Sequence, residues 1–253
     1  MKASSKLAWI ALIAGIAVPA LAQSGSTPYV YLRSNANQPW GQTTNEDAMD
    51  NEFGSGNWTT QYYETISAAS LLSSSTLFIF MEGGDSSFAS FQSFMIAHGD
   101  ARTQADGTTA GDGTITAWIQ AGGRLLIMSA PNDPLNSATV YLPGSITLWA
   151  DAFYNSAASI GEATDNSSPI FTSPHWTSGS LSGDFVAHGY FTGSSMHLLM
   201  KSDLNEAILG RTAIGHGLMM FGGMTTDNFH EPQPGAHYLL ENIIDYTAHV
   251  ATN

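Results

Sequence analysis

The chain alternates between short apolar runs and polar turns, and the lengths of the runs separate strands from helices. The segments from Thr76 to Met81 and from Arg124 to Met128 are almost continuously apolar, which is typical of strands buried on both faces of a sheet. Shorter β-rich segments run from Tyr29 to Arg33 and from Trp58 to Glu64. We therefore expect these segments to share one sheet, with Thr76 to Met81 in its interior.

Two helices are indicated by apolar side chains three or four positions apart, which lie on one face of a helix. The first set is Phe88, Phe91, Phe94 and Met95, and the second is Ile115, Trp118 and Ile119. Gly122 and Gly123 follow the second set and end its helix directly before the strand that starts at Arg124. Strand, helix, glycine turn and strand in this order form a βαβ unit, whose strands are parallel.

Two further helices are expected, one near each end of the chain. The first runs from about Glu46 to Phe53 with Asn45 as its N-cap, and the second is an amphipathic helix from Ala236 to Val250. The pattern of residues 132–183 indicates only loops and short strands.

The last third of the chain contains three β-rich segments before the final helix. They are Met196 to Met200, Ala207 to Leu209 and Leu218 to Phe221, and Gly215-His216-Gly217 predicts a hairpin turn before the third. Taken with the βαβ unit, these elements favour an α/β fold with an open, mostly parallel sheet and helices on both faces.

The first 22 residues have the three parts of a secretory signal peptide. Lys2 and Lys6 precede an apolar run from Leu7 to Val18, and Ala22 ends a small-residue cleavage site. We expect residues 23–253 to form a single mature domain that is secreted or periplasmic. No later apolar run reaches about 18 residues, so we expect no membrane attachment after cleavage.

Composition narrows the classes of ligand. The chain has 7 Lys+Arg against 21 Asp+Glu, a net charge of −14 and no cysteine. The negative charge disfavours nucleic acid and anionic membranes as partners and leaves small molecules, peptides and glycans. Without cysteine, the chain lacks disulfides, thiolate metal sites and thiol nucleophiles. The composition leaves the oligomeric state open.

No local motif predicts a metal or a cofactor. No histidine pair has the H-E-x-x-H spacing of zinc proteases. The turn from Asp106 to Asp112 lacks the alternating carboxylates and the terminal glutamate of a calcium loop. We expect this turn to be a solvated loop.

A ligand site is expected beyond the carboxyl ends of the parallel strands, where loops leave the sheet and amide groups are free to bind. The residues that follow the predicted strands are polar or glycine. The candidate ligand-binding residues are Arg33, Asn35, Gly84, Asp85, Asn132, Asp133 and Thr225.

Ser129 is the candidate nucleophile because it directly follows a buried strand, where a sharp turn can project its hydroxyl. The amide N–H of Ala130 would then stabilise an oxyanion. His230 is the first candidate base and His188 the second, with Glu82 or Glu231 to orient the imidazole. The alternative for Ser129 is an ordinary structural hydrogen bond at a strand end.

The order of these motifs resembles the class I glutamine amidotransferase-like superfamily. The similarity lies in the strand ending at Glu82-Gly83-Gly84-Asp85, the Gly122-Gly123 turn into the strand before Ser129, and the terminal Phe229-His230 segment. The resemblance implies a flavodoxin-like sheet with Ser129 at the nucleophile position, where amidotransferases have the cysteine that this chain lacks. Serine-using relatives, such as cyanophycinases and aspartyl dipeptidases, carry a Ser-Ala pair similar to Ser129-Ala130.

Two functions remain open at this point. The first is a secreted hydrolase of an amide, ester or lactone bond that uses Ser129. The second is a non-catalytic extracellular module of the same fold, which binds a carbohydrate, a peptide or another partner. Four tryptophans in loop-like regions offer stacking surfaces for the second function, namely Trp40, Trp58, Trp149 and Trp176.

Overall fold

The computed structural model describes residues 28–100, 102–103, 109–132, 138–151, 160–183 and 185–251. The signal peptide predicted over residues 1–22 lies outside the described residues, as do Asp106 and the candidate ligand residue Asp133. Within the described ranges, no helix combines the length and the apolar character that crossing a bilayer requires.

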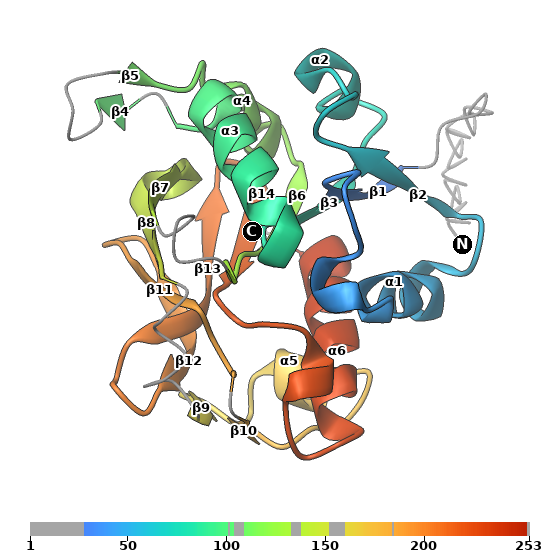
Figure 1. Cartoon of the computed structure of the whole chain (residues 1–253), viewed down its shortest axis with the longest axis vertical. Coiled ribbons are helices and arrows are strands. Elements are labelled where there is room, and N and C mark those ends of the chain that lie inside the picture. The colour runs from blue at the N-terminus through green and yellow to red at the C-terminus, as the bar shows by residue number, and fades with distance from the viewer. Residues whose placement is uncertain are drawn as a thin grey trace, which may run out of the picture.

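The described chain alternates strands with short helices (Figure 1). The strands are β1 (Tyr29–Arg33), β2 (Trp58–Tyr62), β3 (Phe78–Glu82), β4 (Arg102–Thr103), β5 (Thr109–Ala110), β6 (Arg124–Met128), β7 (Ala138–Leu142), β8 (Ile146–Ala150), β9 (Ile160–Ala163), β10 (Ser180–Ser182), β11 (Gly189–Thr192), β12 (His197–Ser202), β13 (Ala207–Ile214) and β14 (Gly217–Gly222). The helices are α1 (Thr44–Phe53), α2 (Ala68–Leu71), α3 (Phe88–His98), α4 (Thr114–Gln120), α5 (Pro169–Thr172) and α6 (Gly235–His249).

Twelve of the described strands form one sheet, and β4 and β5 pair separately as a small ladder. The main path of the sheet is β10-β9-β12-β13-β14-β6-β3-β1-β2, with β11, β8 and β7 branching from β13. The five strands from β14 to β2 are parallel to one another. β3 lies between β6 and β1 and is buried along its whole length, which confirms its predicted interior position.

The prediction of an open, mostly parallel flavodoxin-like sheet is wrong. The sheet is mixed and curls into a half-barrel, and every described pair that involves β7 to β13 is antiparallel. Part of the physical reason is that β7 and β8, β12 and β13, and β13 and β14 follow one another across short turns. A parallel connection needs a crossover of a dozen or more residues, whereas antiparallel strands can be joined by a short turn.

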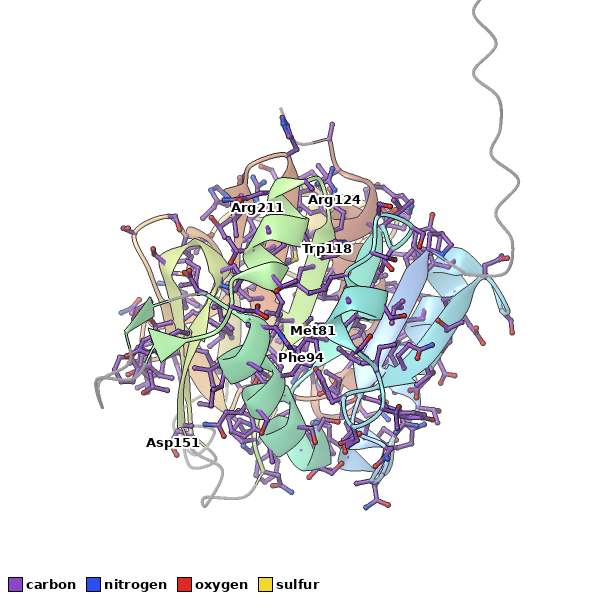
Figure 2. All side chains as sticks on the ribbon, turned by 90° about the horizontal axis from the view of Figure 1, so that it is seen from above. Met81, Phe94, Trp118, Arg124, Asp151 and Arg211 are labelled. Atoms are coloured by element: carbon purple, nitrogen blue, oxygen red, sulfur yellow. The ribbon has the colours of Figure 1, made fainter. Side chains whose placement is uncertain are left out.

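Helices cover both faces of the sheet, as expected. One hydrophobic cluster joins the sheet to α3 and α4, and the other joins it to α1, α5 and α6. Met81 of β3, Phe94 of α3 and Trp118 of α4 belong to the first cluster and lie together in the centre of the view in Figure 2. On the opposite face, α6 packs beside α1 (Figure 1).

Local signals in the sequence can be compared with three element boundaries. α4 is followed by Gly122 at φ +117°, a backbone conformation that glycine adopts readily, so the predicted stop is confirmed. The hairpin predicted around His216 is also confirmed, because β13 and β14 pair antiparallel across it. The predicted cap is wrong, because α1 begins at Thr44 and Asn45 lies inside the helix.

Candidate functional site

The loops that leave β3, β6 and β14 are joined by backbone hydrogen bonds at the carboxyl edge of the parallel strands. The amide of Gly83 donates to the carbonyl of Met128 at 2.6 Å, and the amide of Asp85 donates to Ala130 at 2.9 Å. The amide of His188 donates to Gly223 at 2.8 Å. These bonds place the candidate residues after β3, after β6 and near position 188 on one rigid edge.

Ser129 lies at the predicted strand end, but its side chain is turned into the protein. The side chain is fully buried, and its Oγ donates a hydrogen bond of 3.1 Å to the carbonyl of Gly83. Its amide donates to Gly222 at 2.8 Å. Within the described residues the hydroxyl is therefore bonded to backbone rather than to an imidazole. Ala130, the proposed oxyanion donor, is also fully buried.

His230 is buried beside Thr225, with 3.0 Å between its Nε2 and the Thr225 Oγ1. Burial lowers the pKa of His230 to about 4, and the carboxylate of Asp227 only partly offsets that effect. The imidazole is neutral at pH 7. Thr225 also donates to the carbonyl of Phe185, so this candidate pair is fixed by the surrounding loop.

His188, the second candidate base, differs from His230 in its hydrogen bonding. Its side chain is buried, and neither ring nitrogen has a hydrogen-bond partner among the described residues. The carbonyl of Pro131 lies close enough to favour the charged imidazole but outside hydrogen-bond geometry. Burial is the larger effect and lowers the pKa of His188.

Glu82 ends β3 and is almost completely buried. Its Oε1 accepts a hydrogen bond from the amide of Gly84, and its Oε2 accepts one from Nδ2 of Asn45. Burial outweighs these bonds and raises the pKa of Glu82 to about 8. The side chain is therefore mainly a neutral carboxylic acid at pH 7, and Asn45 of α1 is its partner rather than a helix cap.

Glu82 and His230 line the same small internal cavity, which has a volume of about 30 Å³. A volume of this size holds a water molecule or two but no sugar or peptide. Thr44, Thr226 and Asp227 contribute further polar groups to its wall. Glu82 and His230, which the sequence suggested for one catalytic site, thus both line a cavity without room for a substrate.

A larger pocket of about 380 Å³ opens beside this edge and is lined by Trp40, Asn132, Phe185 and Phe229. Trp40 lines both this pocket and the internal cavity. We call the larger one the aromatic pocket. Its rim is apolar and accessible, since the Phe185 side chain is 46% exposed.

The aromatic pocket is walled by rings that support one another. The centroid of Trp40 lies 5.7 Å from that of Phe229 and 5.3 Å from that of His188. The ring centroid of Phe185 lies 6.2 Å from that of His188 and 6.3 Å from that of Phe229, so each of the four rings contacts two others. These separations are normal for ring packing, so the rings form a continuous wall with His188 behind it.

Trp40 and Asp85 are held in unusual backbone conformations at this wall. Trp40 has φ +58° and Asp85 has φ +43°, values that non-glycine residues rarely adopt. The amide of Trp40 donates to Oδ2 of Asp85 at 2.9 Å, and Nδ2 of Asn132 donates to Oδ1 at 3.3 Å. Asp85 therefore fixes both a ring and an amide of the aromatic pocket.

Other predicted residues have different surroundings. Arg33 pairs with Glu46 at 3.5 Å and packs over the ring of Tyr62, so it links β1 to α1 and β2. Asn35 is exposed, and its amide donates to Glu64. Glu231 is exposed and forms a backbone bridge to Ser182, with no contact to an imidazole among the described residues.

Sequence reasoning identified Trp40 and Asn132 but missed Phe185. An isolated phenylalanine between Asp184 and Val186 has no periodic signal that separates a binding residue from a core residue. Of the other tryptophans named from the sequence, Trp149 stacks near Tyr190 and Trp176 is 76% exposed. Neither lines the aromatic pocket.

No protein-family model matches the sequence, and no curated protein matches it. Among solved structures, the chain is similar to a cytoplasmic protein from Salmonella typhimurium, at 12% identity over 87% of this chain and 99% of that chain, with a TM-score of 0.45. It is similar to a ThuA-like protein from Bacteroides uniformis, at 11% identity over 91% and 95% of the two chains, with a TM-score of 0.44.

A β-galactosidase from Rahnella sp. R3 also aligns, at 12% identity and a TM-score of 0.48, over 88% of this chain but 32% of that chain. At TM-scores below 0.5, these similarities carry no conclusion about activity.

Proposed function

We propose that the protein is a non-catalytic binding module that takes a neutral carbohydrate in the aromatic pocket. The observation that carries this proposal is the pocket of about 380 Å³ with Trp40, Phe185 and Phe229 in its wall. Sugar rings have apolar faces that stack on aromatic side chains, and such stacking contributes beyond the area it buries. The net charge of −14 favours a neutral ligand over an anionic one.

One polar side chain adds specificity to this stacking surface. Asn132 is exposed at the pocket and is oriented by its hydrogen bond to Asp85, so its free amide atoms are available to sugar hydroxyls. A pocket with an apolar wall and a few fixed polar groups is typical of small-ligand sites.

The serine hydrolase is the weaker candidate. A nucleophile must reach the substrate and a base, whereas the buried Ser129 hydroxyl donates to the carbonyl of Gly83. We retain export through residues 1–22 as part of the proposal, because an extracellular module meets free and polymeric glycans.

Binding can be tested by titrating the purified protein with a panel of neutral mono- and oligosaccharides in a calorimeter. Phe185→Ala should weaken the affinity for a bound sugar about 10-fold, because it removes one stacking face from the pocket rim. Trp149→Ala is the matched control, since Trp149 is a similarly exposed aromatic residue at 42% that does not line the pocket. Its affinity should equal that of the wild type.

Two results would count against the proposal. One is the absence of saturable binding across the panel, and the other is an equal loss in the Phe185→Ala and Trp149→Ala variants. A fluorophosphonate probe separates the hydrolase from the binding module. We expect no covalent labelling of the wild-type protein, while labelling that disappears in Ser129→Ala would favour the hydrolase.

A further inference from the structure

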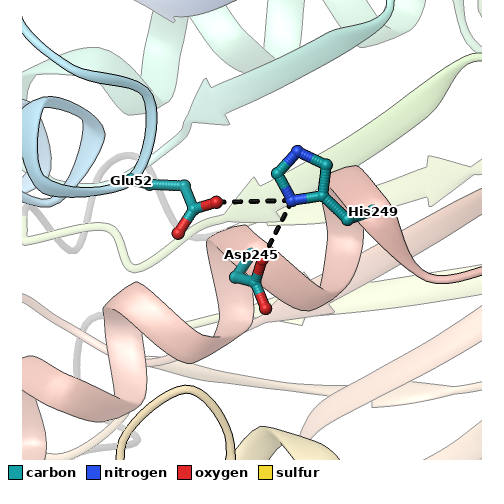
Figure 3. A group of neighbouring side chains, drawn as sticks. All are labelled: Glu52, Asp245 and His249. Atoms are coloured by element: carbon teal, nitrogen blue, oxygen red, sulfur yellow. Dashed lines mark hydrogen bonds and ion pairs between the residues drawn. The ribbon is translucent and has the colours of Figure 1, made fainter.

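Helices α1 and α6 end next to each other on the face of the sheet that they both cover. Glu52 is the penultimate residue of α1, and His249 is the last residue of α6. Asp245 lies one turn before His249 on the same helix. Figure 3 shows these three side chains pointing toward one another from the two helices.

The spacing of the three side chains matches that of metal ligands. His249 Nδ1 lies 2.9 Å from Asp245 Oδ1 and 3.3 Å from Glu52 Oε1. One ligand atom from each residue lies within 4.8 Å of the other two. Ligands bound at about 2.0–2.2 Å in a tetrahedral zinc site lie about 3.3–3.6 Å apart. An ion could thus replace the proton between His249 and the carboxylates with small side-chain movements.

The local charge favours a cation at this place. Both helices direct their carboxyl-terminal ends here, where the helix dipole is negative. The carboxylates of Glu52 and Asp245 each place one oxygen within 4.8 Å of the other, so two acidic groups share this place. Within the described part of the chain, the only side chain that forms an ion pair with Glu52 or Asp245 is His249.

The side chains are already held in place. The Glu52 side chain is 13% exposed. The ring of His249 packs edge-on against Phe53, with 6.1 Å between the centroids. His249 is 49% exposed, so a fourth ligand could come from solvent. Partial burial on one side and access on the other suit a site that is loaded from solution.

We propose that Glu52, Asp245 and His249 bind one divalent transition-metal ion of the zinc class, and that the ion fastens the end of α1 to the end of α6. The imidazole nitrogen selects zinc over calcium or magnesium, which prefer all-oxygen sites. This site is separate from the aromatic pocket and does not depend on the proposed function.

The test is calorimetric titration of chelator-treated protein with zinc chloride. We expect one site per chain. Glu52→Gln, Asp245→Asn and His249→Gln should each weaken zinc binding at least about 10-fold, since each removes one of three ligands. Zinc should also raise the melting temperature of the wild type and leave that of the three variants unchanged. Magnesium and calcium chloride should give no comparable heat.

His98→Gln is the matched control. His98 and Asp112 form a histidine–aspartate contact of 3.1 Å that has no third ligand among the described residues, so removing His98 should leave zinc affinity unchanged. Cobalt absorption supplies a second readout, because a tetrahedral site gives a strong visible band that His249→Gln should abolish. Circular dichroism identifies any variant that fails to fold, and the near-isosteric Glu52→Gln and Asp245→Asn then carry the test.

The proposal is overturned if zinc does not bind, or if the three variants bind it as tightly as the wild type. It is also overturned if His98→Gln loses as much affinity as His249→Gln, because zinc would then be binding to surface histidines in general.

Discussion

Glu82 and His230 are buried in the wall of one cavity, and burial shifts both toward their neutral forms. The pKa of Glu82 rises to about 8 and that of His230 falls to about 4. Neither group carries much charge at pH 7, although they are the kinds of residue that often form catalytic pairs. Their shifts have opposite consequences for the dependence of stability on pH.

Glu82→Gln should change that dependence on the alkaline side. Between pH 4.5 and 8 folded Glu82 keeps a proton that the unfolded chain releases, so the wild type loses stability as pH rises. The variant lacks this loss, so its free energy of unfolding relative to that of the wild type should increase by about 3 kcal/mol between pH 4.5 and 7. Rotation of the Asn45 amide lets its oxygen accept a hydrogen bond from the side-chain amide that the substitution introduces.

Urea unfolding at several pH values measures this difference. Glu231→Gln is the control, because Glu231 is exposed, and its curve should run parallel to that of the wild type. If the Glu82→Gln curve is also parallel to the wild type, the side chain is ionised in the folded protein.

His230→Phe should act on the acid side. Below pH 6.5 the unfolded chain binds a proton that folded His230 does not accept until about pH 4, so the wild type loses stability as pH falls through this window. The variant should avoid about 3 kcal/mol of that loss. His216→Gln is the control, because His216 is exposed, and this variant should lose as much stability at acid pH as the wild type. An unchanged acid limb in His230→Phe would show that the imidazole is protonated in place.

At the level of elements, the sequence predicts the central strands and the long helices well. β3 and β6 appear as apolar runs, and α3 and α6 appear as apolar stripes, because burial alone determines those patterns. The pairing of β9 with β12, or of β8 with β11, joins segments that are distant in the chain. Local periodicity carries no information about such partners, so the antiparallel half was not predicted beyond the hairpin of β13 and β14.

For the candidate site, the sequence predicts the position in the fold but not the directions of the side chains. Placement at the carboxyl edge follows from the general rule for parallel strands, and it located Glu82, Asp85 and Asn132. Side-chain direction did not follow, because the bond from Ser129 to the Gly83 carbonyl depends on how two loops meet. Phe185 reaches the pocket from the antiparallel part of the fold, which the sequence did not define.

The turn between α4 and β6 packs against the start of β14 and depends on one glycine. A Cβ on Gly217 would lie 2.1 Å from the carbonyl oxygen of Ile119 and 2.3 Å from that of Gly123. Gly217→Ala must therefore displace backbone, and we expect a loss of about 3 kcal/mol in the free energy of unfolding. Gly56→Ala is the control, with open space around its Cβ and only the strain of φ +85°, about 1 kcal/mol.

Denaturant unfolding compares the two glycine variants. Equal losses would mean that β14 can move away from α4 without cost.

At the level of the whole molecule, the sheet separates two hydrophobic clusters and α6 runs along one of them. Its first turns line the internal cavity, and its last turn carries Asp245 and His249. Because the packed helix is held along its length, we expect zinc at its far end to change sugar affinity less than about twofold. Sugar titrations with and without zinc check this independence, and a larger change would show that the helix couples the two sites.

The length of α6 also has a practical consequence. Its 15 residues span about 22 Å, from Gly235 at one end to His249 of the Glu52, Asp245 and His249 cluster at the other. A paramagnetic ion seated at the cluster would broaden the NMR resonances of a molecule held against Trp40 by an amount that depends on the distance between the ion and that molecule. The cluster would thereby serve as a fixed reference point from which the distance to an unidentified ligand can be measured in solution.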